Sequence, residues 1–316
     1  MAYTCSARAI AGVLLIWLLS ACSTPQTQAL LSASPSHLRQ RTELSQVPFF
    51  PQEAYQCGPA ALATVLQQSG VAVQPAQLTG FLMIPEKKGS LQAEMLASAR
   101  REGRVAYQLK PELTVVLSEI AAGNPVVVLQ NLALSWYPMW HYAVMIGYDL
   151  PQREILLRSG VNPRQQLPLK TFEYTWARGN YWAMLVLPVG QLPRTADPES
   201  YMLALAALEH TSPQTDSWPG YLASIERWPD SLAVQIGAGN AAYRRHDLNL
   251  SERFFLQAQK DHPDVVAVLN NLAQVQNELG KKGLALATAR HAVELGGPLQ
   301  PEARKTLAEI EQNQPH

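Results

Sequence analysis

Residues 55–62 have the sequence Tyr-Gln-Cys-Gly-Pro-Ala-Ala-Leu, and the rest of the chain is organised around them. The apolar residues after Cys57 recur at helical spacing, and Pro59 suits the first position of a helix because its missing N–H has no intrahelical partner there. We therefore expect the thiol in the first turn of a helix. Unpaired N–H groups and the helix dipole favour a thiolate at that end, so the predicted pKa of Cys57 is below that of a free cysteine. Such a thiol is prepared to act as a nucleophile.

Two further side chains fit the chemistry of an activated thiol. Gln52 carries an amide that can donate a hydrogen bond to an oxyanion formed beside the sulfur. His141 begins the apolar run His-Tyr-Ala-Val-Met-Ile-Gly-Tyr, which predicts a buried strand and supplies a candidate general base. The alternatives are a core histidine with a satisfied hydrogen bond at position 141 and a small buried core residue at Cys57.

These motifs resemble those of a known family of enzymes. Gln52, the segment Cys57-Gly58-Pro59-Ala60 and a histidine that begins a strand are similar to the bacteriocin-processing cysteine peptidases, the C39 family. The resemblance covers residues 47–188, under half of the chain. It implies an α+β papain-like domain in which Cys57, His141 and Gln52 are catalytic.

The third catalytic residue of the family is an Asp or Asn that follows the histidine by about one strand and a turn, usually before a proline. Asn162 precedes Pro163, but it follows His141 by 21 residues, which is later than in the family. Asp149 follows by only eight residues, and Ser159 would be a weak orienter. The resemblance therefore leaves Asp149 and Asn162 as the candidates for orienting the imidazole.

The composition limits the classes of protein to which the chain can belong. Its 316 residues are enough for two domains, and 47% hydrophobic with 16% charged residues is typical of a globular protein. The 25 basic and 25 acidic residues give no electrostatic basis for binding nucleic acid. No phosphate-binding loop ending in Gly-Lys-Ser/Thr is present. The seven histidines are scattered without ligand spacing, so we expect neither a metal nor a cofactor.

The first residues have the pattern of a targeting signal. Arg8 precedes an apolar run over residues 9–19, which is short for a membrane span and suited to the core of a signal peptide. Leu19-Ser20-Ala21-Cys22 resembles the bacterial lipobox, where the signal is cut before a cysteine that carries lipid, and Ser23 resembles the pattern sorted to the outer membrane. We expect a signal peptide over residues 1–21, lipid on Cys22, and a protein anchored in the bacterial cell envelope and facing the periplasm. An ordinary secretory signal is the alternative.

That expectation also determines what we predict for the three cysteines and for the segment after the signal peptide. Cys5 would leave with the signal and Cys22 would be acylated, so Cys57 would be the remaining thiol. An unpaired thiol in an oxidising compartment is a liability unless it is buried or used. Residues 22–46 are polar without a periodic apolar run, which predicts a flexible tether between membrane and enzyme.

The peptidase-like domain is expected over residues 47–188, with helices first and a sheet second. The helix after Cys57 should stop near Gly70, and two more helices are predicted around residues 91–99 and 113–120. Apolar runs then predict strands at residues 126–129, 141–148, 154–158 and 181–187. The intervening loop, residues 131–140, is unusually aromatic, and it either lines a substrate groove or packs on the body as a hairpin. Gln130 and Asn131 are amides beside the site to which the sequence assigns no role.

The rest of the chain is predicted to be a helical repeat domain over residues 201–316, after a proline-containing linker at 189–200. A shift of 34 residues aligns Pro229 with Pro263, Gly239 with Ala273 and Ala258 with Ala292. This pattern resembles the tetratricopeptide repeat, which implies a concave face that binds an extended peptide or a partner protein. An unrelated helical bundle is the alternative.

Two functions of different class remain. In the first, the protein is a lipid-anchored cysteine peptidase that cleaves a peptide or protein held by its repeats. Relatives cut leader peptides but are usually fused to an exporter with an ATPase, which this sequence lacks. In the second, the peptidase-like domain is catalytically silent and the protein is an adaptor that works through its repeats. A transpeptidase or an amidase would use the same thiol chemistry.

Overall fold

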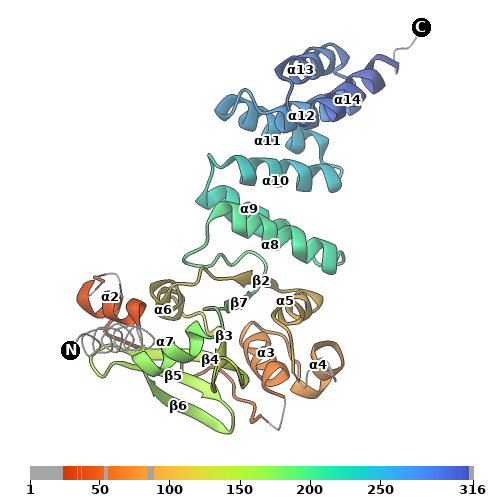
Figure 1. Ribbon diagram of the computed structural model, residues 1–316. Helices are drawn as coiled ribbons and strands as arrows, with labels where there is room; N and C mark the ends of the chain where they lie inside the picture. Colours follow the sequence, from red (N-terminus) through yellow and green to blue (C-terminus); the bar gives the residue numbers. More distant parts are fainter. Residues whose placement is uncertain (1–23, 34, 37, 53–55, 84–88, 313–316) are drawn as a thin grey trace, which may run out of the picture. The chain divides into compact units, whose positions relative to one another are not determined.

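The computed structural model of the chain describes residues 24–312 except 34, 37, 53–55 and 84–88 (Figure 1). The chain forms two compact units. The first contains the residues up to 188 together with 193–195, and the second contains 189–192 and the residues from 196 onward. Among the described residues, no helix is long and apolar enough to cross a membrane.

The first unit is built on one antiparallel sheet whose strands differ in length. Its main path has the order β2-β7-β3-β4-β5-β6, and β1 pairs with the end of β4. Every pairing between these strands is antiparallel. The strands are β1 (Arg41–Glu43), β2 (Val105–Gln108), β3 (Val126–Asn131), β4 (Trp140–Asp149), β5 (Glu154–Ser159), β6 (Asn162–Pro168) and β7 (Ala183–Leu187).

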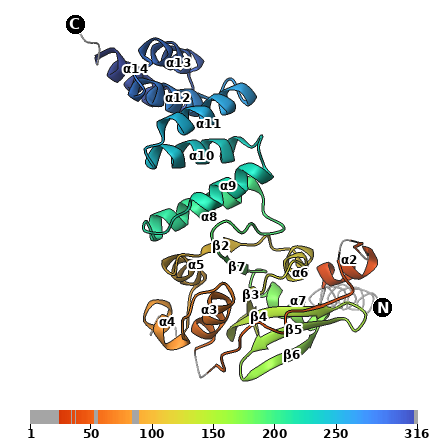
Figure 2. The same ribbon diagram turned by 180° about the vertical axis from the view of Figure 1, so that it is seen from behind.

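Helices cover both faces of this sheet. Figures 1 and 2 show α3, α4 and α5 on one side and α2, α6 and α7 on the other. Their bounds are α2 (Pro25–Ala33), α3 (Cys57–Gln68), α4 (Pro75–Leu82), α5 (Gln92–Arg101), α6 (Leu113–Ala121) and α7 (Leu169–Ala177). Alternate residues of a strand point to opposite faces, so Val127 and Leu129 meet the α3 side whereas Val126 and Val128 face away from it.

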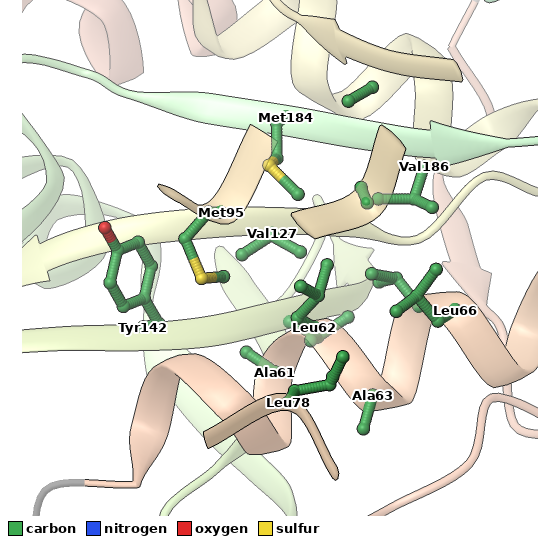
Figure 3. Packing of buried hydrophobic residues seen from close by; sticks show 14 of the residues in the cluster. Ala61, Leu62, Ala63, Leu66, Leu78, Met95, Val127, Tyr142, Met184 and Val186 are labelled. Carbon is green, nitrogen blue, oxygen red and sulfur yellow. The ribbon is translucent and has the colours of Figure 1, made fainter. Parts of the chain in front are cut away.

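The buried face of α3 fixes the position of the predicted nucleophile. Leu62 and Leu66 are fully buried and pack against Val127 of β3 and Met184 of β7 in one hydrophobic cluster (Figure 3). Burying each such side chain contributes roughly 1.5–3 kcal/mol. The first turn of α3 is thereby held against the centre of the sheet.

The predicted helix at Cys57 is present, with one correction at its start. Cys57 is its first residue after the N-cap Gln56, so Pro59 occupies the third position and not the first. The missing N–H of proline is tolerated there as well, because the first four N–H groups of a helix have no intrahelical acceptor. The helix ends at Gln68, and Gly70 follows with a φ of +90°, which favours glycine.

The α+β fold class is confirmed, but the expected order of helices first and a sheet second is wrong. The strand β1 precedes α3, and β2 lies between α5 and α6. Both are short, and an apolar run of three or four residues gives little signal. The sequence also missed α4, α7 and β6; residues 162–168 are mostly exposed and polar because β6 is the edge of the sheet.

The prediction of a flexible tether over residues 22–46 is wrong for its described part. Residues 25–33 form α2, with Thr27 and Leu30 buried. The backbone N–H groups of Gln26 and Thr27 donate to the buried carboxylate of Glu173 on α7, at 2.9 and 2.6 Å. A carboxylate at a helix N-terminus satisfies unpaired N–H groups, and this long-range contact docks a polar segment that has no apolar stripe.

The second unit is all-helical, as predicted, and its helices repeat. The first helix of each pair begins 34 residues after the previous one, at residues 198, 232, 266 and 300. The helices are α8 (Pro198–Thr211), α9 (Trp218–Arg227), α10 (Leu232–Arg244), α11 (Leu248–Asp261), α12 (Val266–Glu278), α13 (Lys282–Leu295) and α14 (Gln300–Gln312).

Small residues let the paired helices of this unit approach closely. A Cβ added at Gly239 of α10 would lie 2.7 Å from the ring of Phe255 on α11. Ser251, at a position where the repeat pattern favours alanine, is fully buried and donates to the carbonyl oxygen of Gly239 at 2.8 Å. Ala258, Ala273 and Ala292 are also fully buried.

Candidate active site

Cys57 lies at the start of α3, half-buried, with its thiol against the backbone of β4. Burial raises the pKa of the thiol above its ordinary value, while backbone hydrogen bonds from Tyr142, Gly58 and Cys57 itself act to lower that pKa. The expectation of a lowered pKa is therefore corrected, because desolvation of the thiolate outweighs the N–H groups at the helix end.

Gln52 is held beside the same residue of β4. Its backbone N–H donates to the carbonyl oxygen of Gly160 at 3.0 Å, which attaches this segment to the turn between β5 and β6. Its side-chain Nε2 donates to the carbonyl oxygen of Tyr142 at 3.4 Å. The amide predicted to bind an oxyanion and the predicted nucleophile thus converge on the backbone of Tyr142.

His141 precedes Tyr142 on β4 and pairs with Gln130 of β3. Its ring is half-buried, and burial lowers its pKa below the ordinary value of 6.5. The Nε2 atom lies 2.9 Å from Ser159 Oγ on β5. Gln52 and Cys57 thus contact the backbone of Tyr142, and His141 is the preceding residue of β4, although 89 residues of sequence separate Gln52 from His141.

Tyr142 contributes to this site and was missed from the sequence. Its hydroxyl donates to the carbonyl oxygen of Ser90 at 3.3 Å, and burial together with the charge of a Cys57 thiolate raises the pKa of Tyr142. Ser90 in turn lies against Gly58, where an added Cβ would be 2.8 Å from Ser90 Cβ. A tyrosine in an apolar run gives no sign of this role, because strand aromatics are ordinarily core residues.

Neither predicted candidate for the third position contacts the imidazole. Asp149 lies at the far end of β4, about 26 Å from His141 at the rise of an extended strand, and its carboxylate accepts from Arg41 Nε at 2.6 Å and from the N–H of Gln152 at 3.0 Å. Asn162 is exposed, and its Oδ1 accepts from the N–H of Arg164 at 2.9 Å.

Ser159 contacts the imidazole instead, because of the register of the sheet. The pairing of β4 with β5 shifts between Met145 and Gly147, so that Val144 pairs with Arg158. The next residue, Ser159, therefore lies near the start of β4, where its hydroxyl meets His141. Sequence spacing could not reveal this pairing, because a one-residue shift moves a side chain to the other face.

The aromatic loop is an exposed hairpin and does not pack on the body. Leu134 and Tyr137 form a bridge across it, and Trp136 and Tyr137 are 80% and 71% exposed. Gln130 and Asn131, to which the sequence assigned no role, are buried at the base of this hairpin. Gln130 Nε2 donates to Thr175 Oγ1 at 2.6 Å.

In the described part of the chain, no group of three or more His, Cys, Asp or Glu side chains is arranged to hold a metal ion. The predicted lipid acceptor Cys22 and the predicted signal peptide lie outside the described residues. The site therefore consists of a thiol, an imidazole, a hydroxyl and an amide, which is the chemistry of a cysteine nucleophile.

Residues 44–184 match the family model described as the Peptidase_C39 like family. This segment is therefore similar to C39-like peptidases. It contains Gln52, Cys57, His141 and Ser159, and it corresponds to the resemblance noted from the sequence over residues 47–188. The match covers under half of the chain and says nothing of the helical unit.

Three solved structures are similar to parts of this chain. A C39-like peptidase from Bacillus anthracis is 20% identical, with a TM-score of 0.40, and the alignment covers 46% of this chain and 97% of that one. The double glycine motif protease of an AMS/PCAT transporter, solved with its leader peptide, is 20% identical with a TM-score of 0.36, covering 46% and 93%. The peptidase domain of Streptococcus ComA, a bifunctional ABC transporter involved in quorum sensing, is 18% identical with a TM-score of 0.38, covering 45% and 99%. A comparison with curated proteins found no match.

Proposed function

We propose that this protein is a lipid-anchored cysteine peptidase of the bacterial periplasm. The observation that carries the proposal is that Gln52 and Cys57 both contact the backbone of Tyr142, the residue that follows His141, within a C39-like domain. A structural cysteine has no need of a glutamine amide that shares its backbone contact next to a histidine.

In the proposed reaction, Cys57 Sγ attacks the carbonyl carbon of a peptide bond. His141 takes the thiol proton and returns it to the leaving amine, which leaves an acyl thioester on the cysteine. Water then attacks the thioester, the acid product departs, and the thiol regains its proton. Gln52 Nε2 and the N–H of Cys57 would stabilise the oxyanion in both steps, while Ser159 orients the imidazole through Nε2.

The raised pKa of Cys57 and the lowered pKa of His141 describe the resting pair in this proposal. Both shifts come from burial and both favour the neutral forms, a thiol and an imidazole. Proton transfer would then accompany the attack on the substrate, and the imidazolium would be needed only in the transition state.

The proposed substrate is a peptide or protein segment, and the helical repeats would hold it or a partner protein. An apolar hollow of about 430 Å³ lies between α8 and α10, lined by Met202, Leu203 and Ile236 among others. Leu203 is 72% exposed there. A 34-residue tetratricopeptide-like repeat and an apolar hollow support binding of an extended chain.

The location rests on sequence alone. The lipobox-like Leu19-Ser20-Ala21-Cys22 after an apolar run supports lipid on Cys22 and an outer-membrane protein that faces the periplasm. Palmitate labelling of cells that express the chain, with Cys22→Ser as control, tests this part of the proposal.

A silent peptidase-like adaptor is the second candidate. The observation that favours it is the third position, where the neutral hydroxyl of Ser159 replaces a carboxylate or an amide. A hydroxyl stabilises an imidazolium less than a carboxylate does, so this arrangement gives His141 weak support as a base.

A peptide-cleavage assay separates the two candidates. The chain from residue 22 onward, carrying Cys22→Ser, is incubated with a mixed peptide library, and products are identified by mass spectrometry. A peptidase gives products that disappear in Cys57→Ala and in His141→Ala. If no product depends on Cys57, the adaptor takes the place of the peptidase.

A further inference from the structure

The hairpin between β3 and β4 exposes a run of large hydrophobic side chains. We define the hairpin tip as residues 132–140. Its exposed large side chains are Leu132 (46%), Leu134 (52%), Trp136 (80%), Tyr137 (71%), Met139 (58%) and Trp140 (53%). Contiguous exposed apolar surface of this kind marks a binding surface, because soluble proteins otherwise avoid it.

Hydrogen bonds at the base of the hairpin fix the conformation of the tip. The buried Asn131 side chain accepts from the N–H groups of Ala133 and Met139, at 3.0 and 2.9 Å, and so closes the base of the hairpin. Arg178, at the end of α7, donates to the carbonyl oxygen of Asn131 at 2.8 and 3.1 Å. The apolar side chains are therefore presented to an occupant, because the braced backbone keeps them from folding back onto the sheet.

The N-terminal end of α2 reaches the same helix as the base of the tip. Glu173 on α7 binds the first N–H groups of α2, and Arg178, which binds Asn131, follows it by five residues. Five residues of helix advance about 7.5 Å. The buried Thr24 precedes α2, and the proposed lipid acceptor Cys22 comes two residues earlier in the sequence.

The chemistry of the tip favours lipid as its occupant. Residues 131–140 contain no charged side chain, while Trp and Tyr are the residues enriched at the boundary between headgroups and acyl chains. We propose that the hairpin tip inserts into the interfacial layer of a phospholipid bilayer.

This inference rests on the envelope location in the proposed function, and it adds which part of the domain would face the bilayer. His141 directly follows Trp140 of the tip. The candidate active site therefore lies at the base of the hairpin. The peptidase would then act on chains at the membrane surface, and the substrate would be one that emerges from or lies along a bilayer.

Vesicle binding tests the inference without lipid on the protein and without catalysis. The chain from residue 22 onward with Cys22→Ser is mixed with vesicles of phosphatidylethanolamine and phosphatidylglycerol, and bound protein is measured by flotation. We expect binding that is insensitive to salt, because the tip is uncharged. Trp136→Ala/Tyr137→Ala should lower the partition coefficient about tenfold or more, since each aromatic side chain loses its buried area. Phe81→Ala, which removes an aromatic side chain 59% exposed on α4, should leave binding unchanged.

Hydrogen exchange of the unsubstituted chain gives a second readout. Vesicles should slow exchange in residues 132–139 and leave α4 unchanged. The inference is overturned if the chain does not float with vesicles, if the double variant binds as well as the parent, or if exchange in the tip is unaffected. It is also overturned if the double variant binds vesicles normally but cleaves library peptides poorly in solution, because the tip is then a peptide-binding element. If Cys57→Ala loses cleavage but still binds vesicles, the result supports the proposed peptidase activity and leaves the membrane inference as it stands.

Discussion

The Nε2 atom of His141 on β4 lies 2.9 Å from the hydroxyl of Ser159 on β5, at the candidate active site. A hydroxyl at this position can fix the plane of the imidazole but brings no negative charge. The arrangement makes Ser159 a positioning residue, and the chemistry of the site should respond to changes at that position.

Removing this hydroxyl should weaken catalysis without unfolding the domain. We expect Ser159→Ala to lower kcat about tenfold with KM little changed, because the net value of one hydrogen bond is roughly 0.5–1.5 kcal/mol. Ser159→Asp should raise the pKa of His141, which an NMR titration of the ring measures, because a carboxylate stabilises the imidazolium. Asn162→Ala, in the same hairpin, is the control and should leave both quantities unchanged. An unshifted imidazole titration in Ser159→Asp would show that the two side chains do not meet in solution.

Gln52 should matter for turnover and not for the reactivity of the thiol. Gln52→Ala is expected to lower kcat by about 10²–10³, the usual cost of losing one oxyanion donor. Alkylation of Cys57 by iodoacetamide forms no oxyanion, so its rate should stay near that of the unsubstituted protein. Gln68→Ala, at the exposed end of α3, is the matched control. Equal losses in cleavage and alkylation would point to a disturbed helix start.

His141 should make the protein less stable in acid. Its pKa is lowered by burial in the folded state, so below the ordinary value of 6.5 the unfolded chain binds the proton first. The free energy of unfolding should therefore fall as the pH decreases from 6.5 to the folded-state pKa, and stay level above 6.5 as far as this group is concerned. Urea unfolding of the parent and of His141→Gln at several pH values measures the difference. Parallel pH profiles for the two proteins would contradict a buried, neutral imidazole.

Gly58 should not tolerate a side chain. A Cβ there would lie 2.8 Å from Ser90 Cβ, so Gly58→Ala is expected to cost about 1–3 kcal/mol of stability through overpacking. Gly80→Ala on α4 has open space around it and should stabilise the protein by about 0.5–1 kcal/mol, as alanine does in a helix. Thermal unfolding of both variants checks the contrast. Gly58→Ala combined with Ser90→Gly should recover part of the loss if the clash is the cause.

The docking of α2 should depend on Glu173. Glu173→Ala leaves the N–H groups of Gln26 and Thr27 without their acceptor, which we expect to cost about 1–3 kcal/mol and to release α2. Faster hydrogen exchange over residues 26–30 would report the release. Lys170→Ala, exposed on the same helix, should leave exchange in α2 as it is.

The sequence by itself determined the features that depend on local pattern. The apolar run after Cys57 specified a helix with the thiol at its start, and the run after His141 specified a buried strand. The 34-residue period of the second unit was visible because small residues recur at equivalent positions of two consecutive repeats, as at Gly239 and Ala273 or Ala258 and Ala292. These features follow from periodicity and from the properties of Gly, Pro and Ala, which act within a few residues.

The tertiary structure alone decided what depends on residues far apart in the chain. Ser159, and not Asp149 or Asn162, meets His141 because the register shift between β4 and β5 sets which side chains of the two strands lie close together. The pKa of Cys57 rises because packing of α3 against the sheet desolvates the thiol, a cost that outweighs the local helix end. The segment around Thr27 is a docked helix because one buried carboxylate, 146 residues away in sequence, accepts its N–H groups.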